Sequence, residues 1–170
     1  MSAGIDQAYT DPPATTEQIL DHNKYVIGEG PRNLPALTAA LDGWDVHDEG
    51  ALGEWGLRVI FGESVSAGEA TQAAAGWGND QYRVLSRGDD VAVVIHYIGD
   101  SERDAEEAAD AFIAHAGSAM GAGSPVESGD GLLYDQAGIY VFIDRVGDEL
   151  FFIAATSQSA GANLRAQFGL

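Results

Sequence analysis

The sequence predicts an α+β fold in which an antiparallel sheet, built from two strand–strand–helix (ββα) units, carries its helices on one face. Three observations support this prediction. Residues 91–98 (VAVVIHYI) form an apolar run rich in β-branched residues, which is typical of a central strand. Residues 81–116 and 139–168 both follow the order strand, turn containing Gly-Asp, strand and helix. The alanines between 105 and 116 form an apolar stripe that allows a helix to lie close to a sheet.

Local signals along the chain predict the individual elements. Thr15 is a candidate N-cap for a short helix after Pro12 and Pro13, and Ser66 restarts a helix that Gly62 interrupts. The expected elements are helices at 51–75 and 100–116, strands at 81–86, 91–98 and 131–136, a Gly/Ser loop at 117–131, a hairpin of 139–144 with 149–156, and a last helix at 157–168. We expect one domain, with an irregular segment at 1–50 packed on an α+β domain at 51–170.

The chain has 170 residues and a formal net charge of −19, with Lys24 as its single lysine. Phosphate binding requires clustered Lys and Arg, so we expect no nucleic-acid partner. The charge indicates either high solubility or adaptation to high salt, in which counterions screen the self-repulsion. No run of about 18 or more apolar residues occurs, so no membrane insertion is expected. The absence of cysteine excludes disulfides and thiolate chemistry.

No motif of a familiar catalytic class is present, because the sequence lacks HExxH, a P-loop, G-x-S-x-G and G-x-G-x-x-G. We therefore predict no catalytic residues, no metal site and no cofactor. Two histidines keep other hypotheses open. His47, within DVHDE, offers an imidazole and carboxylates to a divalent cation, although a solvated acidic loop is the simpler interpretation. His96 lies in the apolar run, and a catalytic role would require a second titratable group within hydrogen-bond reach.

The most distinctive segment is GWGNDQY at 76–82, which holds two aromatic residues and two glycines. In a structural interpretation it is a turn from helix to strand, with Trp77 filling the core. In a functional interpretation it is a ligand platform, in which Trp77 and Tyr82 supply apolar surface and Asp80 anchors a polar group. The candidate ligand-binding residues are Trp55, Trp77, Asp80, Tyr82 and His96.

At this segment the sequence resembles a family of exported bacterial and haloarchaeal proteins regarded as zinc metallopeptidase-like or surface proteins. The family's Gly-Trp-Gly-Gly-Asp-Arg-Tyr tract stands here as GWGNDQY, and its tract around Thr-Thr-Glu-Gln stands as PPATTEQILDHNKY at 12–25. A further tract matches DSERDA at 100–105, and these tracts cover most of residues 9–116 in the family's order. Bacterial members carry an HExxH helix upstream, which this chain lacks. Neither the zinc site nor peptidase activity is therefore carried over.

The resemblance implies the C-terminal region of such a protein and an exported or cell-surface location, with a cytoplasmic location left open. We predict a non-catalytic accessory domain that binds a substrate or a partner, the partner being a peptidase-like part or another protein. This hypothesis predicts an exposed apolar patch near residues 5–60. The alternatives are a free-standing small-ligand-binding module with a pocket near Trp77 and a purely structural role at the cell surface.

Overall fold

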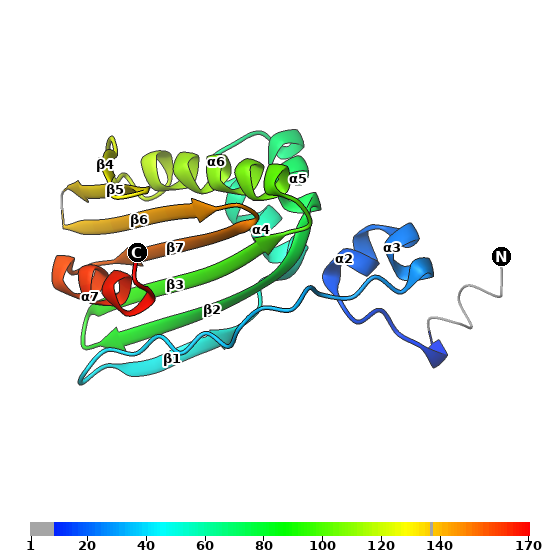
Figure 1. Ribbon diagram of the computed structural model, residues 1–170, viewed down its shortest axis with the longest axis horizontal. Helices are drawn as coiled ribbons and strands as arrows, with labels where there is room; N and C mark the ends of the chain where they lie inside the picture. Colours follow the sequence, from blue (N-terminus) through cyan, green and yellow to red (C-terminus); the bar gives the residue numbers. More distant parts are fainter. Residues whose placement is uncertain (1–8, 137) are drawn as a thin grey trace.

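A computed structural model of the protein describes residues 9–136 and 138–170. Its centre is a seven-stranded antiparallel sheet in the order β1-β2-β3-β7-β6-β5-β4 (Figure 1). The strands are β1 (Asp45–Gly50), β2 (Trp77–Arg87), β3 (Asp90–Gly99), β4 (Val126–Ser128), β5 (Gly131–Gln136), β6 (Ile139–Val146) and β7 (Glu149–Ala155). The predicted α+β class and antiparallel sheet are confirmed.

Two helices precede the strands, and the other helices lie between or after them. The helices are α2 (Thr16–Leu20), α3 (His22–Ile27), α4 (Gly53–Gly62), α5 (Ala67–Ala75), α6 (Glu102–Ser118) and α7 (Gln158–Phe168). The caps predicted at Thr15 and Ser66 are both present, and Ser66 forms a full capping box with Glu69. In the part of the chain that the structure describes, no helix is both long and apolar enough to cross a membrane.

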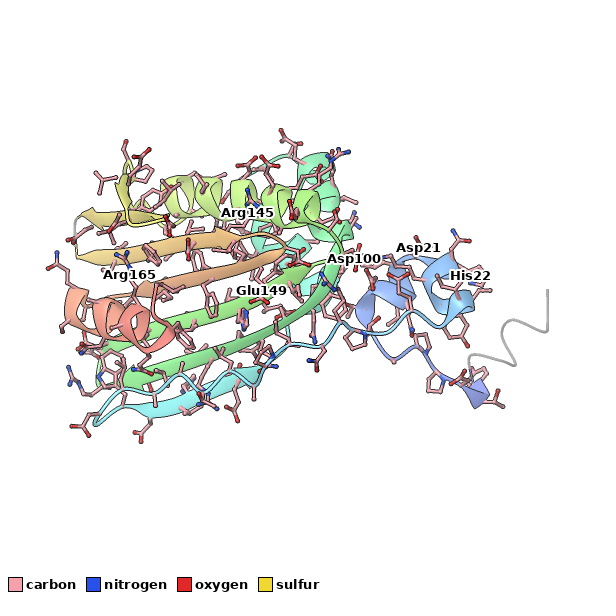
Figure 2. All side chains as sticks on the ribbon, in the orientation of Figure 1. Asp21, His22, Asp100, Arg145, Glu149 and Arg165 are labelled. Atoms are coloured by element: carbon pink, nitrogen blue, oxygen red, sulfur yellow. The ribbon has the colours of Figure 1, made fainter. Side chains whose placement is uncertain are left out.

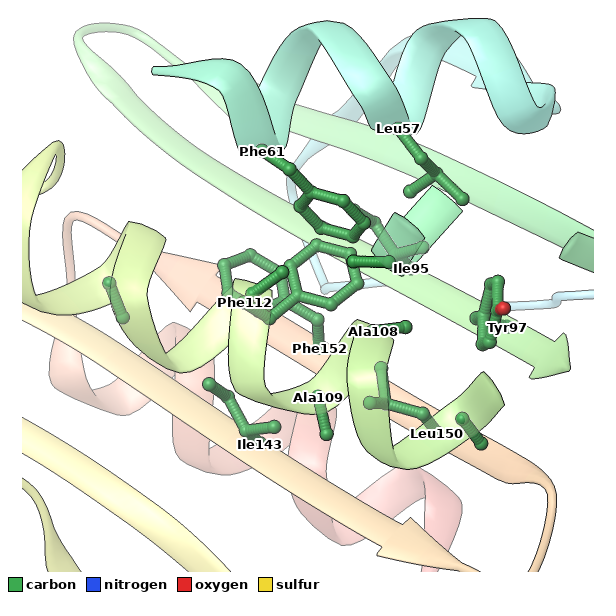
Figure 3. Close-up of a cluster of buried hydrophobic side chains, with 14 of the residues drawn as sticks. Leu57, Phe61, Ile95, Tyr97, Ala108, Ala109, Phe112, Ile143, Leu150 and Phe152 are labelled. Carbon is green, nitrogen blue, oxygen red and sulfur yellow. The ribbon is translucent and has the colours of Figure 1, made fainter. Parts of the chain in front are cut away.

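The two faces of the sheet are covered by different elements. Helices α4, α5 and α6 pack on one face, where the Phe112 ring stacks on Phe152 and meets Phe61 edge to face (Figure 3). Helix α7 packs on the opposite face, where Ala160 and Leu164 contact a second apolar cluster. The prediction that the helices share one face is therefore wrong.

The physical reason is that the central strands are apolar on both sides. In β6 the five residues from Tyr140 to Asp144 are all buried, so that side chains pointing to either face need a cover. Helix α7 provides part of that cover and lies very close to the sheet, since a Cβ placed on Gly161 would come within 2.1 Å of the Tyr140 ring. A continuous apolar run, unlike an alternating one, indicates a strand buried on both faces.

The N-terminal segment contributes more structure than was predicted. Residues 45–50, which the sequence analysis placed in the irregular segment, form the edge strand β1 and pair with β2. Leu37 and Ala39 in the preceding extended stretch are buried in the cluster beneath α7, and they help to cover that face. Helices α2 and α3 project from the end of the sheet where β3 ends (Figure 1).

Candidate functional site

Trp77 and Asp80 form a buried node at the start of β2. The Asp80 carboxylate, which is 0% exposed, accepts hydrogen bonds from Trp77 Nε1 at 2.7 Å, from Gly53 N at 2.8 Å and from Leu52 N at 2.7 Å. The last two donors are the unpaired N–H groups at the beginning of α4, so Asp80 caps this helix from a strand. Burial raises the pKa of Asp80, and the three hydrogen bonds act in the opposite direction. The segment 76–82 therefore has the structural role described above.

Tyr82 lies two residues further along β2 and is half-buried. Its hydroxyl donates to Asp48 Oδ2 on β1 at 2.8 Å. Beside it is a surface hollow of about 530 Å³, lined among others by Leu37, Glu49 and Arg83. Asp80 and Tyr82 line this hollow, whereas Trp55, Trp77 and His96 do not.

His96 lies on β3 next to Gln81 of β2, on the face opposite to Asp80 and Tyr82. Its Nε2 is 3.1 Å from Glu149 Oε2, and its ring stacks on Phe151 with centroids 4.1 Å apart. The sheet face that carries Glu149 is turned to the viewer in Figure 2. Glu149 is thus a second titratable group within hydrogen-bond reach of His96, as a catalytic role would require. However, no hydroxyl of the described residues hydrogen-bonds to the imidazole. This geometry supports a cross-strand contact between β3 and β7 better than a nucleophile–base pair.

Asp144 stands on the other side of Phe151 in the same row of the sheet. It is 7% exposed, and its Oδ1 has no hydrogen-bond partner among the described residues. Burial raises the pKa of this carboxyl, and the nearby Asp130 raises it further. Because Phe151 separates Asp144 from His96, the two groups do not form one catalytic site.

The five candidate residues therefore do not meet in one pocket. Trp77 and Asp80 are internal, Tyr82 lines a surface hollow, and His96 lies on the other face of the sheet. Trp55 is on the outer side of α4 and is 54% exposed. Trp77, Asp80 and Tyr82 are close in the sequence because they belong to one helix-to-strand turn, and His96 is on the other face because neighbouring strand residues point to opposite faces.

An acidic cluster, which the sequence analysis did not identify, surrounds Lys24 on α3. The Lys24 ammonium lies 2.8 Å from Asp100 Oδ2 and 3.1 Å from Glu29 Oε1, and it also contacts Glu17. Glu17, Glu29 and Asp100 each place one oxygen within 4.8 Å of the others, the only such group of potential metal ligands among the residues described. Burial alone would lower the pKa of Lys24, but the three hydrogen-bonded carboxylates outweigh it and raise this pKa. We call these four residues the Lys24 cluster.

Glu54, in the first turn of α4, is a further carboxyl group whose charge interacts with those of Glu17 and Lys24. The residue is 6% exposed, and no donor from the described part of the chain hydrogen-bonds to its side chain. Burial raises the pKa of Glu54 to about 7, with repulsion from Glu17 as the next cause. Glu17, Glu29, Glu54 and Asp100 are far apart in the chain, so no local pattern of residues indicates that they interact. The one local feature that pointed to this place is that Lys24 is the single lysine of the sequence.

Exposed apolar side chains gather on α2 and α4. Ile19 is 68% exposed, Leu20 38%, Trp55 54% and Val59 53%. Leu20 and Ile19 are one turn from Thr16, whose Oγ1 accepts from Trp55 N at 3.3 Å, and Val59 is one turn from Trp55. These four exposed side chains therefore lie on two helices that touch at Thr16. We call Ile19, Leu20, Trp55 and Val59 the apolar ridge.

Comparison with known proteins finds one family. The family model described as a domain of unknown function (DUF8575) matches residues 44–165, from just before β1 into α7. The matched region contains Asp80, Trp55 and His96, whereas Lys24, α2 and α3 precede it. No curated protein and no solved structure matches the chain.

Proposed function

The chain belongs to the DUF8575 family, and we propose that it is a non-catalytic domain that binds a protein partner through the apolar ridge. The observation that carries this proposal is the exposure of four large apolar side chains on two touching helices. Single exposed apolar residues are ordinary on a protein surface, whereas contiguous groups of them mark binding sites. Their position agrees with the patch that the accessory-domain hypothesis places near residues 5–60.

The ridge has features that favour binding over incidental exposure. The ridge includes Trp55, and tryptophan is enriched among the residues that contribute most to protein–protein affinity. Thr16 ties α2 to α4 through the Trp55 amide, and Gln18 Nε2 donates to the carbonyl of Glu29, which holds α2 against the following loop. A surface that is already ordered loses little conformational entropy on binding.

The charge of the chain limits the chemistry of the partner. At −19 the protein repels a second copy of itself and attracts surfaces of the opposite sign. The partner that fits is a protein with an apolar patch surrounded by basic side chains. Whether that partner is a peptidase-like part, as the resemblance implies, is a prediction, and so is a location at the cell surface.

The proposal is tested by placing a photo-reactive phenylalanine derivative at position 55, 59 or 91 and illuminating the producing cells. Positions 55 and 59 should give the same cross-linked protein, which should be absent from position 91 because Val91 is exposed near the start of β3, at the end of the strand away from α2 (Figure 1). That protein is then purified and its affinity measured for the wild type and for Trp55→Glu and Val91→Glu. Equal affinity of all three proteins would contradict the proposal, and a cross-link to the chain itself would indicate self-association instead.

The small-molecule alternative near Trp77 receives less support. Trp77 is 3% exposed and its indole N–H is already bonded to Asp80, so its ring offers no surface to a ligand. The purely structural role at the cell surface remains an alternative prediction, and the cross-linking experiment separates it from partner binding.

A further inference from the structure

We propose that the N-terminal helices α2 and α3 recognise the partner through an apolar face that points away from the domain and that Lys24 holds in position. We call residues 16–29 the N-terminal arm. Its outer face consists of Ile19, Leu20, Val26 and Ile27. The inference rests on the proposed function, because it extends the apolar ridge to α3 and names the part of the chain that contacts the same partner.

Helix α2 turns its polar side to the domain and its apolar side to the solvent. Glu17 and Gln18 are buried, whereas Ile19 and Leu20 are exposed. A surface helix ordinarily has the opposite arrangement, with its apolar stripe toward the core and its polar stripe toward water. The reversed arrangement leaves in water the side chains whose burial would be favourable, so it indicates that another surface covers them.

Helix α3 repeats this reversed arrangement. The Lys24 side chain is 18% exposed, whereas Val26 is 61% and Ile27 71% exposed. Val26 is two residues after Lys24, and with about 3.6 residues per turn it lies on nearly the opposite side of α3 from the ammonium. Ile19 is likewise two residues after Glu17, which contacts that ammonium. Both helices therefore direct apolar side chains away from the Lys24 cluster.

The polar inner side fixes the arm to the body of the domain. Lys24 Nζ lies 2.8 Å from Asp100 Oδ2, in the turn between β3 and α6, and Figure 2 shows Asp100 where the arm meets the body. Thr16 Oγ1 accepts from Trp55 N at 3.3 Å, and a side chain in place of Gly53 would collide with Thr16. The arm is thus ordered before it binds, which lowers the entropic cost of association.

The arm precedes the region by which the family is recognised. It projects from the end of the sheet where β3 ends (Figure 1), and the family model begins at residue 44. The α2 part of the apolar ridge therefore lies on the arm, whereas the α4 part lies in the matched region. The surface for the partner is assembled from the family domain and from a segment that precedes it.

The charges of the arm limit what covers its outer face. Residues 16–29 contain three carboxylates and one ammonium, within a chain of net charge −19, and Asp21 at the start of α3 is exposed. This charge repels a second copy of the chain and an anionic membrane surface. The occupant that fits is a protein with an apolar groove wide enough for two short helices and with basic side chains at its rim.

The test introduces the photo-reactive phenylalanine derivative at position 26 of the full chain, with position 126 as the matched control. Val26 and Val126 are 61% and 58% exposed, but Val126 is on β4, at the other end of the molecule from the arm (Figure 1). In the same cells, position 26 should give the cross-linked protein that position 55 gives, and position 126 should not. Val26→Glu should weaken the affinity for that purified protein by roughly tenfold or more, whereas Val126→Glu should stay within about twofold of the wild type.

The role of Lys24 is tested with the same purified protein. Lys24→Met should lower the affinity by roughly three- to tenfold, because a smaller fraction of the molecules presents the assembled surface. Lys24→Arg, which keeps a cation next to Asp100, should restore most of the affinity. Arg103→Met, which removes a side chain that is 79% exposed on α6, is the control and should bind like the wild type. Circular dichroism at the binding temperature checks that each variant is folded.

Failure of this inference differs from failure of the proposed function. If Trp55→Glu weakens binding and Val26→Glu does not, the apolar ridge stands and recognition by the arm is wrong. If neither variant weakens binding, both proposals are wrong. A cross-link from position 26 to a second copy of the chain, or no cross-link from it, would also overturn the inference. If Lys24→Met binds like the wild type, Lys24 does not hold the arm in its binding position.

Discussion

Two buried carboxyl groups lie at the beginning of α4, and they differ in the hydrogen bonds that they accept. Asp80 is fully buried and accepts three hydrogen bonds, two of them from the amides that begin the helix. Glu54 is almost as buried and accepts none from the described residues. Burial raises the pKa of both groups, but for Asp80 three donors oppose it, whereas for Glu54 the nearby Glu17 adds to it. Burial of an acid therefore lowers stability when its charge has no partner.

The largest expected loss of stability comes from replacing Asp80, whose carboxylate accepts three hydrogen bonds. Asp80→Asn keeps one acceptor and brings an amide N–H₂ toward donors from Leu52, Gly53 and Trp77, so buried N–H groups lose their partners. We expect a loss of about 3 kcal/mol or more in the free energy of unfolding, measured by urea denaturation. Asp89→Asn, in the exposed turn before β3, is the control and should stay within about 0.5 kcal/mol of the wild type. A similar small loss for Asp80→Asn would contradict the capping role.

A slightly smaller loss is expected from removing the one ammonium of the Lys24 cluster. Lys24→Met leaves Glu17, whose side chain is 3% exposed, without its ion-pair partner. Breaking a fully buried pair costs several kcal/mol, and the partial exposure of Lys24 reduces this to about 2–3 kcal/mol. Unfolding in urea without divalent cations measures it, with Arg103→Met as the control because that side chain is 79% exposed. If both variants lose the same amount, the cluster does not stabilise the fold.

Glu54 should make the free energy of unfolding depend on pH. Its pKa is raised from 4.5 to about 7, so the folded protein binds more protons than the unfolded chain between these values. Stability from this group is therefore present at low pH and is lost as the pH rises toward 7. Relative to the wild type, Glu54→Gln should gain on the order of 2 kcal/mol between pH 4.5 and 8. A difference between the two proteins that does not change with pH would show that Glu54 is solvated.

The smallest effect on stability is expected at the apolar ridge. Trp55→Ser removes a side chain that is 54% exposed, so the free energy of unfolding should change by no more than about 0.5 kcal/mol. The same variant should lose affinity for the cross-linked partner, whereas Val91→Ser should keep it. Calorimetry and binding measurements on the same preparations separate the two properties. A large loss of stability would mean that Trp55 belongs to the core.

Several features followed from the sequence alone because they depend on neighbouring residues. The helix restart at Ser66, the hairpin turn before Glu149 and the apolar run of β3 are all local, and each was predicted where it occurs. The structural interpretation of GWGNDQY was also available, since a tryptophan between glycines at a helix-to-strand turn is usually buried. The acidity of the chain follows from counting its charged residues, and the classes of partner that it disfavours follow from that acidity.

Only the tertiary structure decided which distant residues meet. Alternation along β2 and β3 placed His96 opposite to Asp80 and Tyr82, which divided the predicted site between two faces. The central strands are buried on both faces, and helix α7 covers the face opposite to α6. Folding of the N-terminal segment brought Glu17 and Lys24 to Asp100, some eighty residues away in the chain. Such contacts depend on packing between elements, and no local pattern of residue types records them.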